Sequence, residues 1–205
     1  MKKGVAQYLL FAIIFIAGCN SFSFHRIKQV AITTSDGIDT SQVLFLKNQI
    51  ESRYNVHVVF LPSFTMPQQA FYFPRNRFMA GILLDYLSNH KANGVDYVLG
   101  ITDKDISTST DKYADFGIIG LAHMPGNSCI VSIFRLGKNI PPNLFKERLT
   151  KVCLHELGHD FGLSHCPNAG CFMNDAKGKI ATIDAESDSL CGDCKRKISG
   201  FIKQD

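Results

Sequence analysis

The residues most able to do chemistry stand close together, in the run HELGHDFGLSH over residues 155–165. On an α-helix, side chains four residues apart lie on the same face, so His155 and His159 present two imidazoles to one point. A Zn²⁺ ion accepts neutral imidazole nitrogens at about 2.0–2.1 Å and prefers tetrahedral coordination. The spacing therefore predicts that one helical face supplies half of a zinc coordination sphere.

The rest of the run favours a catalytic zinc site over an amphipathic helix with surface histidines. Gly162 lacks a Cβ atom, so it can adopt a positive φ, end the helix and reverse the chain. We expect this reversal to bring His165 back as the third ligand, which leaves the fourth position open for water. Glu156 is the expected general base, taking a proton from the zinc-bound water and passing it to the leaving amine.

A methionine and several cysteines follow the histidines. A lone methionine such as Met173 is ordinarily a residue that fills a gap in the core. Two close cysteine pairs separated by a longer loop are usual in closed, structural zinc–thiolate sites. These four residues are Cys166, Cys171, Cys191 and Cys194. Two disulfides are the alternative in an exported protein, and Cys129 and Cys153 are expected to be buried free thiols.

Taken together, these motifs resemble the archaemetzincin signature. Metzincins place a methionine in a turn beneath the zinc, and this resemblance implies that Met173 forms an apolar floor that fixes the histidine rings. Similar positions also occur upstream, at Arg77-Phe78, Val98–Asp103, Asp105, Phe116-Gly117, Arg135-Leu136 and Arg148–Lys151. The similarity covers nearly all of residues 27–200. It implies two zinc ions per chain, one catalytic and one structural, and hydrolysis of peptide bonds, with aminopeptidase-like action as one form. The alternative is a zinc-containing binding or scaffold lipoprotein of the cell envelope that turns over little or no substrate.

The N-terminus carries an export pattern. Two lysines precede an apolar run over residues 8–17, which is too short to cross a hydrocarbon core of about 30 Å as a stop-transfer helix. The run ends in Ile-Ala-Gly-Cys, which resembles the bacterial lipobox, where cleavage leaves a lipidated cysteine. We therefore expect a signal peptide over residues 1–18, a lipidated tether over 19–26 starting at Cys19, and a metallopeptidase domain over 27–205. This predicts an exported, membrane-anchored lipoprotein of a bacterial cell envelope, with a plain signal peptide as the alternative.

Composition and periodicity indicate the fold. The 205 residues are 45% hydrophobic and 20% charged, and a net charge of +4 with scattered basic residues argues against a nucleic-acid partner. Strands are expected over residues 27–34, 56–61, 95–101, 116–122 and 129–134, and helices over 40–53, 75–89 and 141–162. This alternation predicts an α/β fold, with a mixed, mostly parallel sheet, covering helices, the active-site helix and a cysteine-rich zinc-bound C-terminal segment. Ile82 is expected on the buried side of the second helix. Arg148 and Lys151 are expected on a solvated face of the third, with an approach to the substrate as the alternative.

Overall fold

The computed structural model describes residues 26–203, and the predicted signal peptide and Cys19 lie outside this range. Its centre is a five-stranded sheet with the order β2-β1-β5-β9-β8. Four strands run parallel and the edge strand β8 runs antiparallel to β9, which confirms the predicted mixed sheet. The strands are β1 (Lys28–Thr34), β2 (Val56–Phe60), β5 (Tyr97–Thr102), β8 (Gly120–Ala122) and β9 (Ser128–Ser132).

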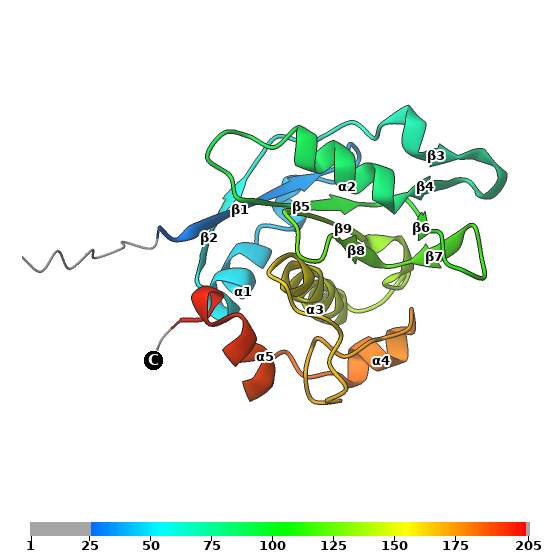
Figure 1. The fold of residues 1–205 in the computed structure, drawn as a ribbon. Helices are drawn as coiled ribbons and strands as arrows, with labels where there is room; N and C mark the ends of the chain where they lie inside the picture. Colours follow the sequence, from blue (N-terminus) through cyan, green and yellow to red (C-terminus); the bar gives the residue numbers. More distant parts are fainter. Residues whose placement is uncertain (1–25, 204–205) are drawn as a thin grey trace, which may run out of the picture.

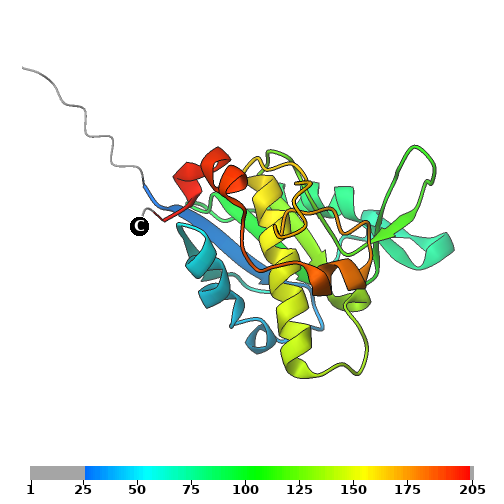
Figure 2. The same ribbon diagram turned by 90° about the horizontal axis from the view of Figure 1, so that it is seen from below.

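Helices cover both faces of this sheet, so its strands are buried on both sides. Successive side chains of a strand point to opposite faces, so Val30 and Ile32 of β1 enter one core and Ala31 the other. Helix α2 (Ala80–Asn89) packs on the Ala31 face. Helices α1 (Leu46–Arg53) and α3 (Pro142–Asp160) cover the opposite face, and Figures 1 and 2 show α3 crossing the sheet there.

The C-terminal segment wraps around α3. Helix α4 (Ile180–Ala185) lies beside α3, and α5 (Gly192–Lys197) follows it on the same side of the sheet (Figure 2). The chain then ends in a 3₁₀ turn at Ser199–Phe201, where the Phe201 ring stacks on that of Phe161 with centroids 4.2 Å apart. Between residues 26 and 203, no helix is both long and apolar enough to cross a membrane.

An acidic side chain fixes the start of β1. The backbone N–H of Gln29 donates to Asp96 Oδ2 at 2.8 Å, and the Arg26 guanidinium donates to both oxygens of Asp96 at 2.7 and 2.8 Å. Partial burial raises the pKa of Asp96, but the Gln29 hydrogen bond and the charges of Lys28 and Arg26 outweigh it, and the pKa is lowered.

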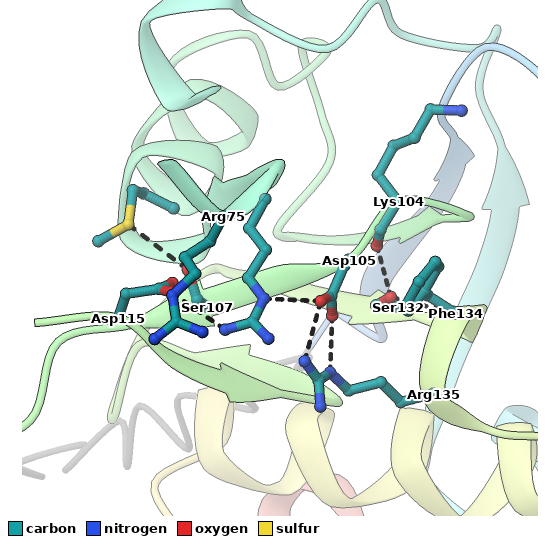
Figure 3. Close-up of polar contacts among 10 residues, drawn as sticks. Arg75, Lys104, Asp105, Ser107, Asp115, Ser132, Phe134 and Arg135 are labelled. Carbon is teal, nitrogen blue, oxygen red and sulfur yellow. Dashed lines mark hydrogen bonds and ion pairs between the residues drawn. The ribbon is translucent and has the colours of Figure 1, made fainter. Parts of the chain in front are cut away.

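A second, four-stranded sheet stands beside the main one, in the order β3-β4-β6-β7. Its strands are β3 (Phe71–Tyr72), β4 (Arg77–Met79), β6 (Ile106–Thr108) and β7 (Phe116–Ile118). Charges tie this sheet to the turn after β9. Arg135 donates to both oxygens of Asp105 at 2.6 and 2.9 Å (Figure 3). Arg77 bridges Asp105 to Asp115 at 2.7 and 3.0 Å. This network holds β7 in place next to the active-site helix.

Three predicted elements are wrong in detail. The helix expected from residue 75 begins at Ala80, because residues 77–79 form β4, and Ile82 is 37% exposed. The strand expected over residues 116–122 divides into β7, which pairs with β6, and β8, which pairs with β9. The helix expected from residue 40 starts with a 3₁₀ turn at Thr40–Gln42 and becomes α-helical at Leu46. In each case pairing with a distant strand, or a local turn, overrides the periodicity of the segment.

Candidate active site and zinc centres

Three histidines converge at the C-terminal end of α3. His155 and His159 lie one turn apart on the helix, and His165 follows the chain reversal, with ligand nitrogens of all three within 4.8 Å of one another. The Nε2 atoms of His155 and His159 are 3.0 Å apart. Two nitrogens bound tetrahedrally at about 2.0–2.1 Å from zinc would be separated by about 3.3 Å. The donor set and spacing therefore fit a zinc ion.

Gly162 makes this reversal possible. Its φ is +99°, a value that residues with a Cβ atom rarely adopt. The N–H of Gly162 donates to His159 O and the N–H of Leu163 donates to Gly158 O, both at 2.9 Å. These two bonds close the helix in the manner of a glycine C-cap, and they turn residue 165 back toward the two helical histidines.

Backbone carbonyls fix the orientation of the two helical imidazoles. Nδ1 of His155 lies 2.7 Å from Phe172 O, and Nδ1 of His159 lies 2.6 Å from Leu163 O. An N–H at Nδ1 leaves Nε2 with its lone pair directed at the metal, as ligation requires. Burial lowers the pKa of His155 to about 4 and also lowers that of His159, so both rings are neutral at pH 7.

Glu156 lies on the adjacent side of α3, against the edge strand. Its side chain is 6% exposed, and burial, with a further contribution from the charge of Asp160, raises its pKa to about 8. Gly120 of β8 leaves the space that this carboxylate occupies, since a Cβ atom there would lie 2.4 Å from Glu156 Oε1. The carboxylate is therefore held between the edge strand and the active-site helix.

Met173 packs against α3 at Gly158. It is fully buried, and a Cβ atom on Gly158 would lie 2.4 Å from its sulfur. The hydroxyl of Tyr54 donates to Leu154 O at 2.8 Å and occupies the neighbouring space. Its ring meets that of Phe172 edge-on, with centroids 6.2 Å apart. The glycine of the HELGH motif thus allows the methionine segment to approach the helix closely.

The four predicted cysteine ligands also converge. Their sulfur atoms lie within 4.8 Å of one another, and the Cys166–Cys191 and Cys171–Cys194 sulfurs are each 3.8 Å apart. Zn–S bonds of about 2.3 Å in a tetrahedron give S···S edges of about 3.8 Å, whereas a disulfide bond is about 2.05 Å long. A hydrogen bond from the Cys194 N–H is the main cause that lowers the pKa of Cys191 to about 7. The geometry fits four-thiolate metal binding, and Cys129 and Cys153 are buried free thiols, as predicted.

A cavity of about 570 Å³ opens over the histidines. Strands β7 and β8 form one wall through Phe116, Ile118 and Gly120–Ala122, and α3 forms the floor. The segment between His165 and α4 closes the far side with Asp175 and its neighbours. This space can accommodate an extended chain segment beside the metal ligands.

The comparisons with known proteins decide the family. A sequence profile described as Peptidase family M54 matches residues 41–200. An archaemetzincin from Pyrococcus abyssi is 35% identical over 165 residues, which are 75% of this chain and 85% of that protein. This chain belongs to peptidase family M54.

Solved archaemetzincin structures agree with this membership. The structure from Methanopyrus kandleri superposes with a TM-score of 0.74 at 28% identity and covers 85% of this chain and 94% of that one. The structure from Archaeoglobus fulgidus, crystallised with malonate, gives 0.71 at 26% identity, with 83% and 99% covered. As a member of the archaemetzincin family with histidine and cysteine groups that fit zinc, the chain is a zinc metallopeptidase, a hydrolase that acts on peptides or proteins.

Sequence reasoning misplaced two residues of the active-site helix and missed one residue of the cavity. Arg148 and Lys151 were expected on a solvated face, but Arg148 donates to Leu136 O at 2.6 Å and to Asp184, and Lys151 is 4% exposed and lines the cavity. Both lie on the side of α3 that α4 covers, and α4 itself was not predicted. Glu186, just after α4, also lines the cavity and belongs to no recognisable motif.

Proposed function

We propose that the chain hydrolyses peptide bonds in the cavity above His155, His159 and His165, with Glu156 as general base. One observation carries the proposal: a buried carboxylate borders the same cavity as three converging imidazoles, yet is not one of the three groups that converge there. A purely structural metal site needs the histidines and has no use for this carboxylate.

Each step assigned to the chain follows from its position. A zinc ion held by the three imidazoles would polarise the scissile carbonyl and lower the pKa of water. Glu156 accepts the proton of the attacking water at its carboxylate and then donates it to the leaving amine. Burial raises the pKa of Glu156 to about 8, and a dication held nearby favours its ionised form, so the group can both accept and release a proton near pH 7.

We further infer that the chain binds two zinc ions. The second site would consist of the four cysteines, with no open position and therefore no catalytic role. Its support is the S···S spacing of 3.8 Å in both pairs. A closed site of this kind would hold the segment after the active-site helix against the C-terminus.

The substrate and the location of the chain are also proposals. The cavity suits a peptide lying beside β8, and aminopeptidase-like trimming is one form of this activity. The lipobox-like sequence supports export and a lipid anchor at Cys19, on the surface of a bacterial cell envelope. Retention of a palmitate label by wild type, and its loss in Cys19→Ala, would test the anchor.

Zinc analysis combined with peptide hydrolysis tests the enzyme proposal. We expect two zinc ions in the wild-type domain, one in His159→Ala and one in Cys191→Ser. His90→Ala and Cys153→Ser, which change residues outside both clusters, should keep two. We expect Glu156→Gln to keep both zinc ions while hydrolysis of a peptide library falls below detection.

The outcomes separate the alternatives. Wild-type hydrolysis by Glu156→Gln would exclude this carboxylate as the base. Full zinc content, with no hydrolysis of any peptide by the wild-type chain, would support the zinc-containing scaffold. A single zinc ion that only the histidine variant loses would mean that the cysteines do not bind metal.

A further inference from the structure

One buried carboxylate in the cavity has no role in the proposed catalysis. Glu186 caps α4 through its backbone N–H, and its residue is 7% exposed. No described donor reaches its Oε1 atom, although this side chain lines the cavity over the histidines. A buried acceptor that lacks a partner costs about 1–3 kcal/mol, and more if it is charged. Such a group is expected to have a partner when the cavity is filled.

The neighbouring lysine does not fill this role. Lys151 donates to Ile183 O at 3.1 Å and pairs with Glu147 at 2.8 Å, so its ammonium group is directed at the end of α4 and at its own helix. Among the described residues, no ion pair within 4 Å joins Lys151 to Glu186. Burial, reinforced by the charge of Asp175 and opposed by that of Lys151, raises the pKa of Glu186 to about 7.

The surroundings of Glu186 define the group that would pair with it. Lys151, whose ammonium group reaches the end of α4 just before Glu186, lies one helical turn before His155. The four residues between these two positions correspond to a rise of about 6 Å along α3. Val152, Ile183 and Ala176 provide apolar lining along this part of the cavity. A substrate group that binds here needs an apolar stem of several carbons and a cationic hydrogen-bond donor at its end.

We propose that Glu186 is a specificity-determining residue that binds a cationic group of the peptide substrate, an ammonium or guanidinium, in the cavity beside the zinc ligands. This inference rests on the proposed peptidase function. A lysine or arginine side chain combines an alkyl stem with such a donor. A free α-amino terminus offers the same ammonium group, and the two sources are separated by the test.

Binding to zinc-loaded Glu156→Gln protein tests this without turnover. The probes are pentapeptides of alanine, acetylated and amidated, with lysine, arginine or norleucine at the centre, and their dissociation constants are measured by calorimetry. Norleucine keeps the alkyl stem and removes the charge. We expect the lysine and arginine peptides to bind at least about tenfold more tightly than the norleucine peptide, as a charged hydrogen bond of about 1.5–3 kcal/mol requires.

Two variants assign that preference to one residue. Adding Glu186→Gln should abolish the difference between the lysine and norleucine peptides. Adding Asp85→Asn, which removes the same charge from an exposed side chain on α2, should leave the difference intact. A fourth peptide, with norleucine at the centre and a free α-amino group, supplies the cation from the other source. Tighter binding of this peptide than of the acetylated norleucine peptide, if it depends on Glu186, also supports the proposal.

Equal affinities of the charged and uncharged peptides for protein that retains Glu186 would overturn the inference. This result would be decisive even if the Glu186→Gln variant did not fold. A cation preference that survives Glu186→Gln would overturn it too. If the wild-type chain hydrolyses nothing but the Glu186-dependent preference is seen, the proposed function fails and this inference stands. If the wild-type chain hydrolyses peptides but shows no Glu186-dependent preference for a cation, the proposed function stands and this inference fails.

Discussion

Gly158→Ala changes the glycine at which the Met173 segment packs against the active-site helix. The new methyl group would lie 2.4 Å from Met173 Sδ and 3.2 Å from Tyr54 Oη, and both residues are fully buried. Overpacking a close-packed core typically costs about 1–3 kcal/mol. Alanine is better than glycine in a helix interior by about 1 kcal/mol, so the net loss of stability is expected to be about 0–2 kcal/mol.

A matched substitution isolates the packing term. Gly81 also lies in a helix, α2, but it is exposed, and a Cβ atom there meets nothing within 4 Å. Gly81→Ala should therefore stabilise the protein by about 0.5–1 kcal/mol. The difference between the two variants, about 1–3 kcal/mol, is the cost of displacing the methionine segment.

Urea unfolding of both variants at saturating zinc measures this difference. The double variant Gly158→Ala/Met173→Ala should lose less stability than the sum of the single variants, because truncating Met173 makes room for the methyl group. If Gly158→Ala stabilises the protein as much as Gly81→Ala does, or if the double variant is additive, the close approach of Met173 to the helix does not constrain the site.

Three further changes test other parts of the structure. Gly117→Ala places a Cβ atom 2.1 Å from Arg135 Nη2, and it should lower the free energy of unfolding by about 1–3 kcal/mol. The rate of peptide hydrolysis should also fall, since β7 lines the cavity; wild-type unfolding and activity would contradict this. Chelation of zinc should make the four clustered thiols reactive to a thiol reagent, because the metal no longer ties the segment after the active-site helix to the C-terminal segment. Cys129 on β9 and Cys153 on α3 lie within the central sheet and helix and should react only on unfolding; labelling of all six of these thiols at once would refute two separate classes of cysteine. Asp96→Asn should destabilise the metal-free protein by about 1 kcal/mol at pH 7. The folded-state pKa of Asp96 is lowered, so the contribution of its carboxylate to stability is present above the unfolded pKa and is lost as pH falls through the folded-state pKa. The difference in unfolding free energy between variant and wild type should therefore close below about pH 4, and a constant difference would exclude this linkage.

Sequence reasoning succeeded where chemistry is encoded in short spacings. The i, i+4 histidines and Gly162 fix the local geometry by helix periodicity and by a backbone conformation that favours glycine, so a convergent site could be predicted without the fold. The mostly parallel sheet with covering helices also followed from the alternation of helices and strands. Such local rules do not depend on distant parts of the chain.

It failed where a residue's environment depends on a distant segment. Lys151 has the spacing of a solvated helix face, and only the docking of α4 on α3 buries it. The segment over residues 77–79 continues a helical pattern, but it pairs with β6, so it becomes a strand. Glu186 has no neighbours in sequence that mark it, since its significance comes from the cavity it lines.

The histidine and cysteine clusters are linked through the backbone that connects them. Cys166 directly follows the third histidine, and its N–H donates to Met173 O at 2.7 Å. Cys171 directly precedes Phe172, whose carbonyl orients the His155 ring at 2.7 Å. Two of the four cysteines therefore hold the ends of the segment that positions the catalytic imidazoles. If the four cysteines hold the second zinc ion proposed above, its release should weaken the catalytic site without removing any of that site's ligands, because the carbonyl that fixes the ring of His155 would lose its support.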